Sequence, residues 1–263
     1  MSAGRRWDDL KPRLLTGGLL ILIGVVDIWL GGITFTITVA LVIGLIIWEL
    51  ARMISPAQTS AAIQLGVLAA ICLLVERHVP NLYALPLLLV PALAGAFILR
   101  AYPWLFAIYA LGITTAGYGL TVFRDDFGVA WLFWLVIVVA MTDIAGYFAG
   151  RMIGGAKFWP AISPKKTWSG VVAGWIAAAC VGAVFVMVTA AGIGLIWISA
   201  VLSFASQMGD IAQSAVKRKM GVKDSSNLLP GHGGLFDRFD AMLGASLFMV
   251  LIVLMFDLPG LRF

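Results

Sequence analysis

The chain has 263 residues, of which 62% are apolar and only 12% are charged, and its mean hydropathy is +1.02. Soluble domains are about 45–50% apolar and about 25% charged, so this composition excludes a soluble globular enzyme, a disordered protein and a fibrous repeat. A membrane-spanning helix uses about 20 residues, and this apolar content suits roughly eight or nine such helices. The net charge of +5 is therefore considered in terms of the side of the membrane on which the cations lie.

Nine apolar segments follow one another along the chain, separated by breaks such as Gly31-Gly32 and Ser55-Pro56. Because backbone groups in lipid must be hydrogen-bonded within their own segment, each segment is expected to be a helix. We predict an all-α, polytopic integral membrane protein that forms a single membrane domain over 1–263. N-terminal helices (14–121) precede C-terminal helices (128–257) that carry the polar motifs. The predicted helices are 14–30, 33–50, 60–76, 81–99, 103–121, 128–149, 168–190, 192–216 and 239–257.

The distribution of cations predicts the orientation of the chain. Nine spans place the two ends on opposite sides of the membrane. If the N-terminus is cytoplasmic, 15 of the 18 Lys and Arg residues lie in cytoplasmic segments, and only Arg77, Arg124 and Arg262 do not. Such an excess is the usual pattern for cytoplasmic loops, so we predict a cytoplasmic N-terminus. The positive charge then needs no nucleic-acid partner to explain it.

Two of the predicted cytoplasmic connections, 151–167 and about 217–238, are longer than turns require. Long connections in a compact architecture are usually functional or disordered. Most of the polar chemistry of the chain lies in these two segments and at the adjoining helix ends, which favours function. We therefore expect the site on the cytoplasmic face.

Carboxylates within apolar helices are the first sign of a site, because each costs several kcal/mol unless it is paired, hydrated or bound to a metal. Glu49 precedes Arg52 by three residues, so we interpret it as half of an ion pair within one helix. Asp143 and Asp210 have no such local cation. These two are therefore the stronger candidates for a functional role.

A polar constellation follows from Asp210 onward. Asp210, Ser214, Lys217 and Arg218 have the spacing i, i+4, i+7 and i+8, which places them on one helical face. Glycines further on permit tight turns and close approach of the backbone to a phosphate. Carboxylates beside cations and a glycine loop indicate metal–phosphate chemistry, and Mg²⁺ usually keeps substrate phosphates and waters in its shell. The downstream members are Lys223, Asp224, Gly231, His232, Gly233, Gly234, Asp237, Arg238 and Asp240.

The stretch from Ser214 to Asp240 resembles the signature of phosphatidate cytidylyltransferases, also called CDP-diacylglycerol synthases, with its spacing intact. Upstream, Asp143 with Gly146-Tyr147 and Gly150-Arg151 is similar to a second region of that family. So is the run Ser163-Pro164-Lys165-Lys166-Thr167-Trp168. Ile144 and Ser169 depart from the residues usual in that second region.

The resemblance implies transfer of a cytidylyl group from CTP to phosphatidate, with release of pyrophosphate, for phospholipid synthesis. It implies Mg²⁺ held by Asp210 and Asp237, and leaves a second, monovalent cation open. It also implies a homodimer among membrane lipids, in the inner (plasma) membrane, with a cytoplasmic active site. Catalytic roles are expected for Asp210, Lys217, Arg218, Asp237 and Arg238. Substrate-binding roles are expected for Asp143, Ser163, Lys165, Lys166, Thr167, Ser214, Lys223, Asp224, Gly231, His232, Gly233, Gly234 and Asp240.

Three other functions compete with this interpretation. A CTP-dependent polyprenol or phytol kinase of related membrane fold would release CDP instead of pyrophosphate. A CDP-alcohol phosphotransferase carries a different aspartate motif, of which Asp237 to Asp240 matches only the tail. A transporter would show paired broken helices in two similar halves, and the sequence has no such symmetry.

Overall fold

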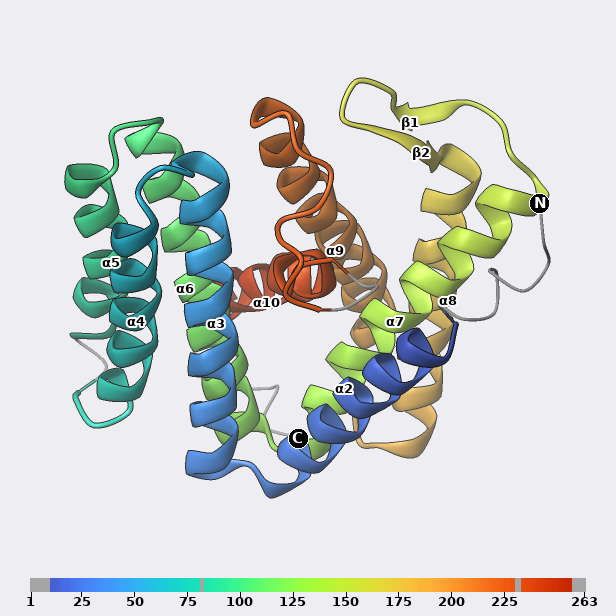
Figure 1. The fold of residues 1–263 in the computed structure, drawn as a ribbon. Coiled ribbons are helices and arrows are strands. Elements are labelled where there is room, and N and C mark those ends of the chain that lie inside the picture. The colour runs from blue at the N-terminus through green and yellow to red at the C-terminus, as the bar shows by residue number, and fades with distance from the viewer. Residues whose placement is uncertain (1–9, 81–82, 230–232, 257–263) are drawn as a thin grey trace. The chain divides into compact units, whose positions relative to one another are not determined.

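The computed structural model describes residues 10–80, 83–229 and 233–256. Each of the nine predicted segments corresponds to a helix, which confirms the all-α polytopic class (Figure 1). Within the described residues, seven helices are long and apolar enough to cross a membrane, while Gly17–Leu30 and α5 are shorter apolar helices. Nine spans and the orientation stay predictions. The elements are α2 (Leu10–Leu30), α3 (Gly32–Ile54), α4 (Thr59–Glu76), α5 (Ala84–Ile98), α6 (Pro103–Phe127), α7 (Val129–Met152), β1 (Lys157–Trp159), β2 (Ser163–Thr167), α8 (Trp168–Val188), α9 (Gly194–Lys219) and α10 (Phe236–Phe256).

The chain divides into two compact units. The first comprises Met1–Gly117 and Met220–Arg238, and the second comprises Tyr118–Lys219 and Phe239–Phe263. The loop 220–238, which the sequence groups with the C-terminal helices, therefore packs with the N-terminal helices. Each unit carries part of the predicted site.

In the first unit, α3 and α4 pack against each other along their length, and α5 packs on α4 (Figure 1). Glycines allow α3 and α4 to approach closely. A Cβ atom added to Gly44 would lie 2.8 Å from the carbonyl oxygen of Gly66, and one added to Gly66 would lie 2.6 Å from that of Gly44. Small residues at a helix crossing are typical of membrane proteins, where helices gain stability from close packing. The buried residues of α3 run from Phe35 to Ile54 and include Glu49.

In the second unit, α7, α8 and α9 pack side by side (Figure 1). Hydrogen bonds between helices join them: Trp134 Nε1 donates to Ser199 Oγ at 3.0 Å, and Thr142 Oγ1 donates to Ser203 Oγ at 2.8 Å. Between α7 and α8 the chain forms an antiparallel two-stranded hairpin, β1 and β2, with Lys157 opposite Thr167. The sequence predicted this segment only as a long connection. The hairpin brings the Lys165-Lys166 pair to the helices.

Candidate functional site

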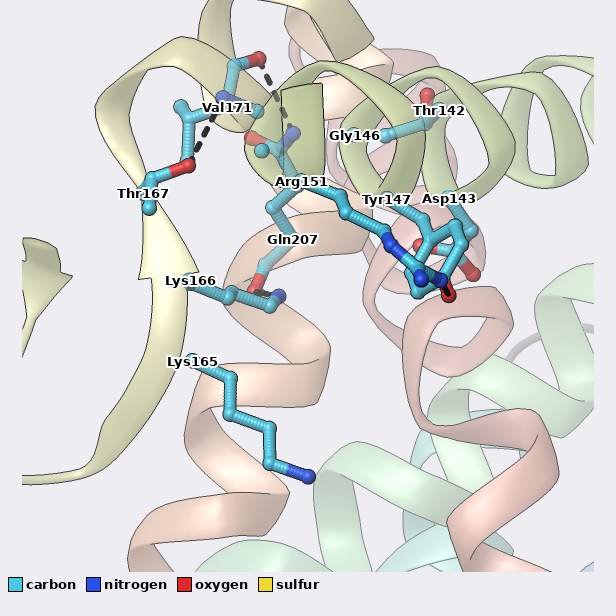
Figure 2. A pocket seen from close by; sticks show the side chains of 12 residues that line it. Thr142, Asp143, Gly146, Tyr147, Arg151, Lys165, Lys166, Thr167, Val171 and Gln207 are labelled. Carbon is cyan, nitrogen blue, oxygen red and sulfur yellow. Dashed lines mark hydrogen bonds between the residues drawn. The ribbon is translucent and has the colours of Figure 1, made fainter. Parts of the chain in front are cut away.

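A cavity of about 350 Å³ opens in the second unit, where α7, β2, α8 and α9 meet (Figure 2). The wall contributed by α8 is backbone-rich, because Gly170 lies close against α7. A Cβ atom on Gly170 would lie 2.6 Å from the carbonyl oxygen of Gly146. The polar side chains that line the cavity are Thr142, Asp143, Tyr147, Arg151, Lys165, Lys166, Thr167 and Gln207. Both regions of the predicted site that lie upstream of Asp210 therefore reach one cavity.

An ion pair joins β2 to α9 at this site. Lys166 Nζ lies 2.6 Å from Asp210 Oδ2, and it also donates to the carbonyl oxygen of Gln207 at 3.3 Å. Ser214 Oγ donates to Asp210 Oδ1 at 3.3 Å, as the i, i+4 spacing predicts. The side chains of Lys166 and Asp210 are 22% and 31% exposed, so water screens their attraction only partly. Asp210 has no cation near it in the sequence, but the fold supplies Lys166 from β2 as its partner.

Two further carboxylates lie within electrostatic range of Asp210. Asp143 of α7 interacts with both Asp210 and Lys166, and Asp240 of α10 interacts with Asp210 and Lys217. The helices can approach there because Gly209 has no side chain. A Cβ atom on Gly209 would collide with the carbonyl oxygen of Asp240. The second unit therefore brings together three predicted carboxylates and two predicted lysines.

The other predicted site residues in and near the hairpin differ from one another in exposure and in their contacts. Lys165 is exposed, and its side chain extends from β2 toward α9 (Figure 2). Thr167 is buried and caps α8, since its Oγ1 accepts a hydrogen bond from the Gly170 N–H. Ser163 lies at the other end of β2, opposite Trp159. Arg218, at the end of α9, donates from Nε to the carbonyl oxygen of Ile162 at 3.4 Å, so it holds the hairpin turn.

Sequence reasoning missed Gln207, which is 5% exposed. Its Oε1 accepts from Trp175 Nε1 at 3.0 Å, and its Nε2 donates to the carbonyl oxygen of Val171 at 3.2 Å. With its own carbonyl oxygen it also accepts from Lys166. An amide in an apolar helix, three residues before Asp210, was the signal available in the sequence. Gln207 ties α8 to α9 at the level of the ion pair.

In the first unit, the signature loop folds around Asp237, in the first turn of α10. Asp237 Oδ2 accepts hydrogen bonds from the backbone N–H of Ser225 at 2.8 Å and from the Gly234 N–H at 3.0 Å. It also lies 3.0 Å from Ser225 Oγ, whose single hydroxyl proton it shares with Glu49. Gly233 adopts a positive φ of 81°, which favours glycine. Lys223, Asp224 and Arg238 are exposed around this loop, and the predicted residues Gly231 and His232 lie outside the described residues.

Glu49 has different partners from the one that the sequence predicted. Its side chain is fully buried, and it accepts from Ser225 Oγ at 2.9 Å, Ser226 Oγ at 2.5 Å, the Leu235 N–H at 2.8 Å and the Phe236 N–H at 2.7 Å. Arg52 instead donates to Thr59 Oγ1 at 3.2 Å. The predicted ion pair between Glu49 and Arg52 is therefore wrong. Two hydroxyls and two backbone amides compensate the charge, as a helix N-terminus does for an anion.

The predicted approach of the glycine loop to a phosphate stays a prediction, and at Gly234 the backbone lies close to Glu49 instead. A Cβ atom there would lie 2.7 and 2.8 Å from the two carboxylate oxygens of Glu49, and closer still to Ser225 Oγ. The neighbour that excludes a side chain at Gly234 is thus the protein itself. This position serves the folding of the loop around Glu49.

Across residues 10–80, 83–229 and 233–256, no three His, Cys, Asp or Glu side chains converge closely enough to hold a metal by themselves. Mg²⁺ usually binds through one or two carboxylates together with waters and substrate phosphates, so it does not need such a cage. The hard oxygen donors of Asp143, Asp210 and Asp240 fit this requirement chemically. Asp210 and Asp237 belong to different units, and their pairing at a metal stays a prediction.

The fold and the site define a polytopic helical membrane protein in which carboxylates and lysines gather beside a cavity. Comparison with known proteins supports this class. The family model described as "Cytidylyltransferase family" matches residues 11–256. The chain therefore belongs to the cytidylyltransferase family. The predicted membership is confirmed, and with it the prediction of a membrane-embedded enzyme.

Two curated relatives align with nearly the whole chain, and a third aligns with less than half of it. A phosphatidate cytidylyltransferase of Brucella suis biovar 1 is 36% identical over 269 residues, which are 96% of this chain and 96% of the relative. That of Bacillus subtilis is 30% identical over 95% of this chain and 99% of its own length. One from Staphylococcus saprophyticus is 42% identical over 120 residues, which are 44% of this chain and 46% of the relative.

Proposed function

We propose that this protein transfers a cytidylyl group from CTP to phosphatidate, which yields CDP-diacylglycerol and pyrophosphate for phospholipid synthesis. The observation that carries the proposal is the complete Ser214–Asp240 signature in a chain that aligns over nearly its full length with relatives named for this activity. The cluster of Asp143, Lys166 and Asp210 beside a cavity supports it, because it combines the charges that phosphate chemistry needs.

In the proposed reaction, a phosphate oxygen of the lipid attacks the α-phosphorus of CTP in line. The new P–O bond forms as the bond to the departing pyrophosphate breaks. Such a transfer depends on positioning and on charge stabilisation, not on a protein nucleophile. Mg²⁺, when bound, would neutralise charge on the phosphate oxygens. Lys165, Lys166 and Arg151 line the cavity and would hold phosphate oxygens there.

The proposed location follows from the substrates. The apolar helices make the protein integral to a membrane. CTP is soluble in the cytosol, whereas the acyl chains of phosphatidate stay in the bilayer. We therefore place the active site at the cytoplasmic face of the inner (plasma) membrane, where both substrates meet. The homodimer and the monovalent cation remain expectations from the family resemblance.

The direct test supplies the purified protein in lipid nanodiscs with labelled CTP, phosphatidate and Mg²⁺. We expect CDP-diacylglycerol and pyrophosphate in equal amounts, and no product after chelation of the metal. The Asp210→Asn variant should lose on the order of 10³-fold in rate, because it removes a preorganised charge next to the reacting phosphates. Release of CDP with phosphorylation of a polyprenol or phytol would favour the kinase alternative instead.

A further inference from the structure

Glu49 lies far outside the signature in sequence but contacts it directly. It is separated by 176 residues from Ser225 and by 187 residues from Phe236, both of which donate hydrogen bonds to it. Its two oxygens accept hydrogen bonds from Ser225 Oγ, Ser226 Oγ and the N–H groups of Leu235 and Phe236, and α3 itself packs against α4. Glu49 thus connects the membrane helices of the first unit to the signature loop.

A short chain of contacts leads from Glu49 to Asp237. Ser225 Oγ lies between the two carboxylates, 2.9 Å from Glu49 Oε2 and 3.0 Å from Asp237 Oδ2. The same serine donates its backbone N–H to Asp237 at 2.8 Å. On the other side, the N–H groups that Glu49 accepts belong to Leu235 and Phe236, which directly precede Asp237. Both ends of the loop around Asp237 are therefore fixed by one side chain.

We propose that Glu49 is a positioning residue of the transfer reaction: it holds the Ser225 hydroxyl and the start of α10 so that the Asp237 carboxylate meets Mg²⁺ in a fixed orientation. The role rests on the proposed function, in which Asp237 is a metal ligand. Groups that orient a ligating carboxylate through hydrogen bonds typically change metal affinity or activity about 10- to 100-fold when they are altered.

The contacts explain why the position requires a carboxylate. Four donors converge on two oxygens, and an amide at this position would turn its NH₂ group toward two of them. Packing alone would not need the charge, because apolar residues of similar size commonly replace buried ionic groups without loss of stability. An acidic side chain in an apolar helix is costly, which argues for a role beyond filling space.

The chain offers a matched control in Glu76, the last residue of α4, which is also buried at 7% exposure. The adjacent Arg77 donates to Thr36 near the start of α3, so Glu76 lies at the opposite end of the α3–α4 pair from Glu49. Glu76→Gln removes a buried charge from the same unit without touching the signature loop. General destabilisation should affect both variants alike.

The experiment compares wild type, Glu49→Gln and Glu76→Gln in nanodiscs by two measurements. Mn²⁺ binding is followed by electron paramagnetic resonance without substrate, and the transfer rate is titrated with Mg²⁺. For Glu49→Gln we expect about 10- to 100-fold weaker Mn²⁺ binding, with a higher Mg²⁺ half-saturation and a lower kcat. Glu76→Gln should stay within about twofold of wild type. Equal Mn²⁺ affinity in wild type and Glu49→Gln overturns the role of Glu49, whereas a wild type that binds Mn²⁺ but transfers nothing from CTP overturns the proposed function.

Should Glu49→Gln fail to fold, Ser225→Ala addresses the same connection, since it removes the hydroxyl between the two carboxylates and leaves the backbone donors in place. It should weaken Mn²⁺ binding in the same direction. Where both variants fold, the double variant should lose less than the product of the single losses, because both changes act through one path to Asp237. Fully multiplicative losses, or unaltered Mn²⁺ binding in Ser225→Ala, contradict the proposed connection.

Discussion

The side chain that organises the second unit is Lys166. It reaches from a short strand to the carboxylate of Asp210 and to the carbonyl oxygen of Gln207, so a single ammonium joins β2 to α9. Removing one partner of such a partly buried ion pair destabilises the protein, because it leaves the other charge uncompensated. In the proposed reaction, Lys166 would orient Asp210 and balance its charge.

Replacement of Lys166 by Met should therefore affect activity strongly. It keeps most of the side-chain volume but removes the charge beside Asp210, and we expect the transfer rate to fall by about 10²-fold or more. The matched control is Lys157→Met on β1, an exposed lysine outside the cavity, which should keep a rate close to wild type. Equal losses in the two variants would show that the hairpin matters only for its fold or its net charge.

At the scale of elements, glycines decide how closely the helices of the second unit approach. Gly209 of α9 packs against α10, with backbone atoms of Asp240 and Gly244 within 3.0 Å of an added Cβ. A backbone neighbour cannot move aside as a flexible side chain can, so any side chain at this position must separate the helices. The separation would move Asp240 away from Asp210.

Gly209→Ala tests this crossing. We expect a lower thermal stability in detergent together with a large loss of transfer rate, because the added methyl group overpacks the crossing and typically costs about 1–3 kcal/mol. Gly194→Ala is the control on the same helix, since a Cβ atom there meets nothing within 4 Å. A Gly209→Ala protein with wild-type melting temperature and wild-type rate would show that α9 and α10 tolerate the added group.

The elements also show what the sequence could predict. The helices were predictable because a backbone in lipid must form its hydrogen bonds within its own segment, which a helix does. The length and hydropathy of each apolar segment are visible in the sequence. The β1–β2 hairpin was missed because its strands are only three and five residues long, and one of them contains Pro164. Glu49 was misinterpreted because Arg52 offered a local partner, whereas the actual donors come from residues 176 to 187 positions away.

The same distinction holds for the candidate site. The i, i+4 contact between Asp210 and Ser214 was predictable, since it depends only on helical spacing. The partner of Asp210 across the fold was not, because Lys166 reaches it only after the hairpin and α8 have formed. Gln207 and Ser225 act through hydrogen bonds to other elements, and such bonds leave no periodic pattern in the sequence.

For the whole molecule, the distribution of cations predicts that the chain alternates sides with a cytoplasmic N-terminus. Asp125 near the end of α6 and Lys157 on β1 are both exposed and are separated by α7, which qualifies as a membrane-spanning helix. They should therefore face opposite sides of the membrane.

This orientation can be measured with single cysteines introduced after Cys72 and Cys180 have been replaced by alanine. A maleimide that cannot cross membranes should label Asp125→Cys on intact cells, and Lys157→Cys only after permeabilisation. The reverse pattern would invert the predicted topology, and labelling of both from outside would show that α7 does not span.

The contact of Glu49 with the distant loop also determines when this part of the protein can fold during synthesis. The ribosome must add 187 residues after Glu49 before Phe236 exists, which takes roughly 10–40 s at about 5–20 residues per second. For most of this interval none of the groups that will donate hydrogen bonds to Glu49 has been synthesised. Glu49 lies five residues before the end of α3 at Ile54. The signature loop can therefore fold around Glu49 only after most of the chain has been synthesised, which makes this contact one of the last to form in biogenesis.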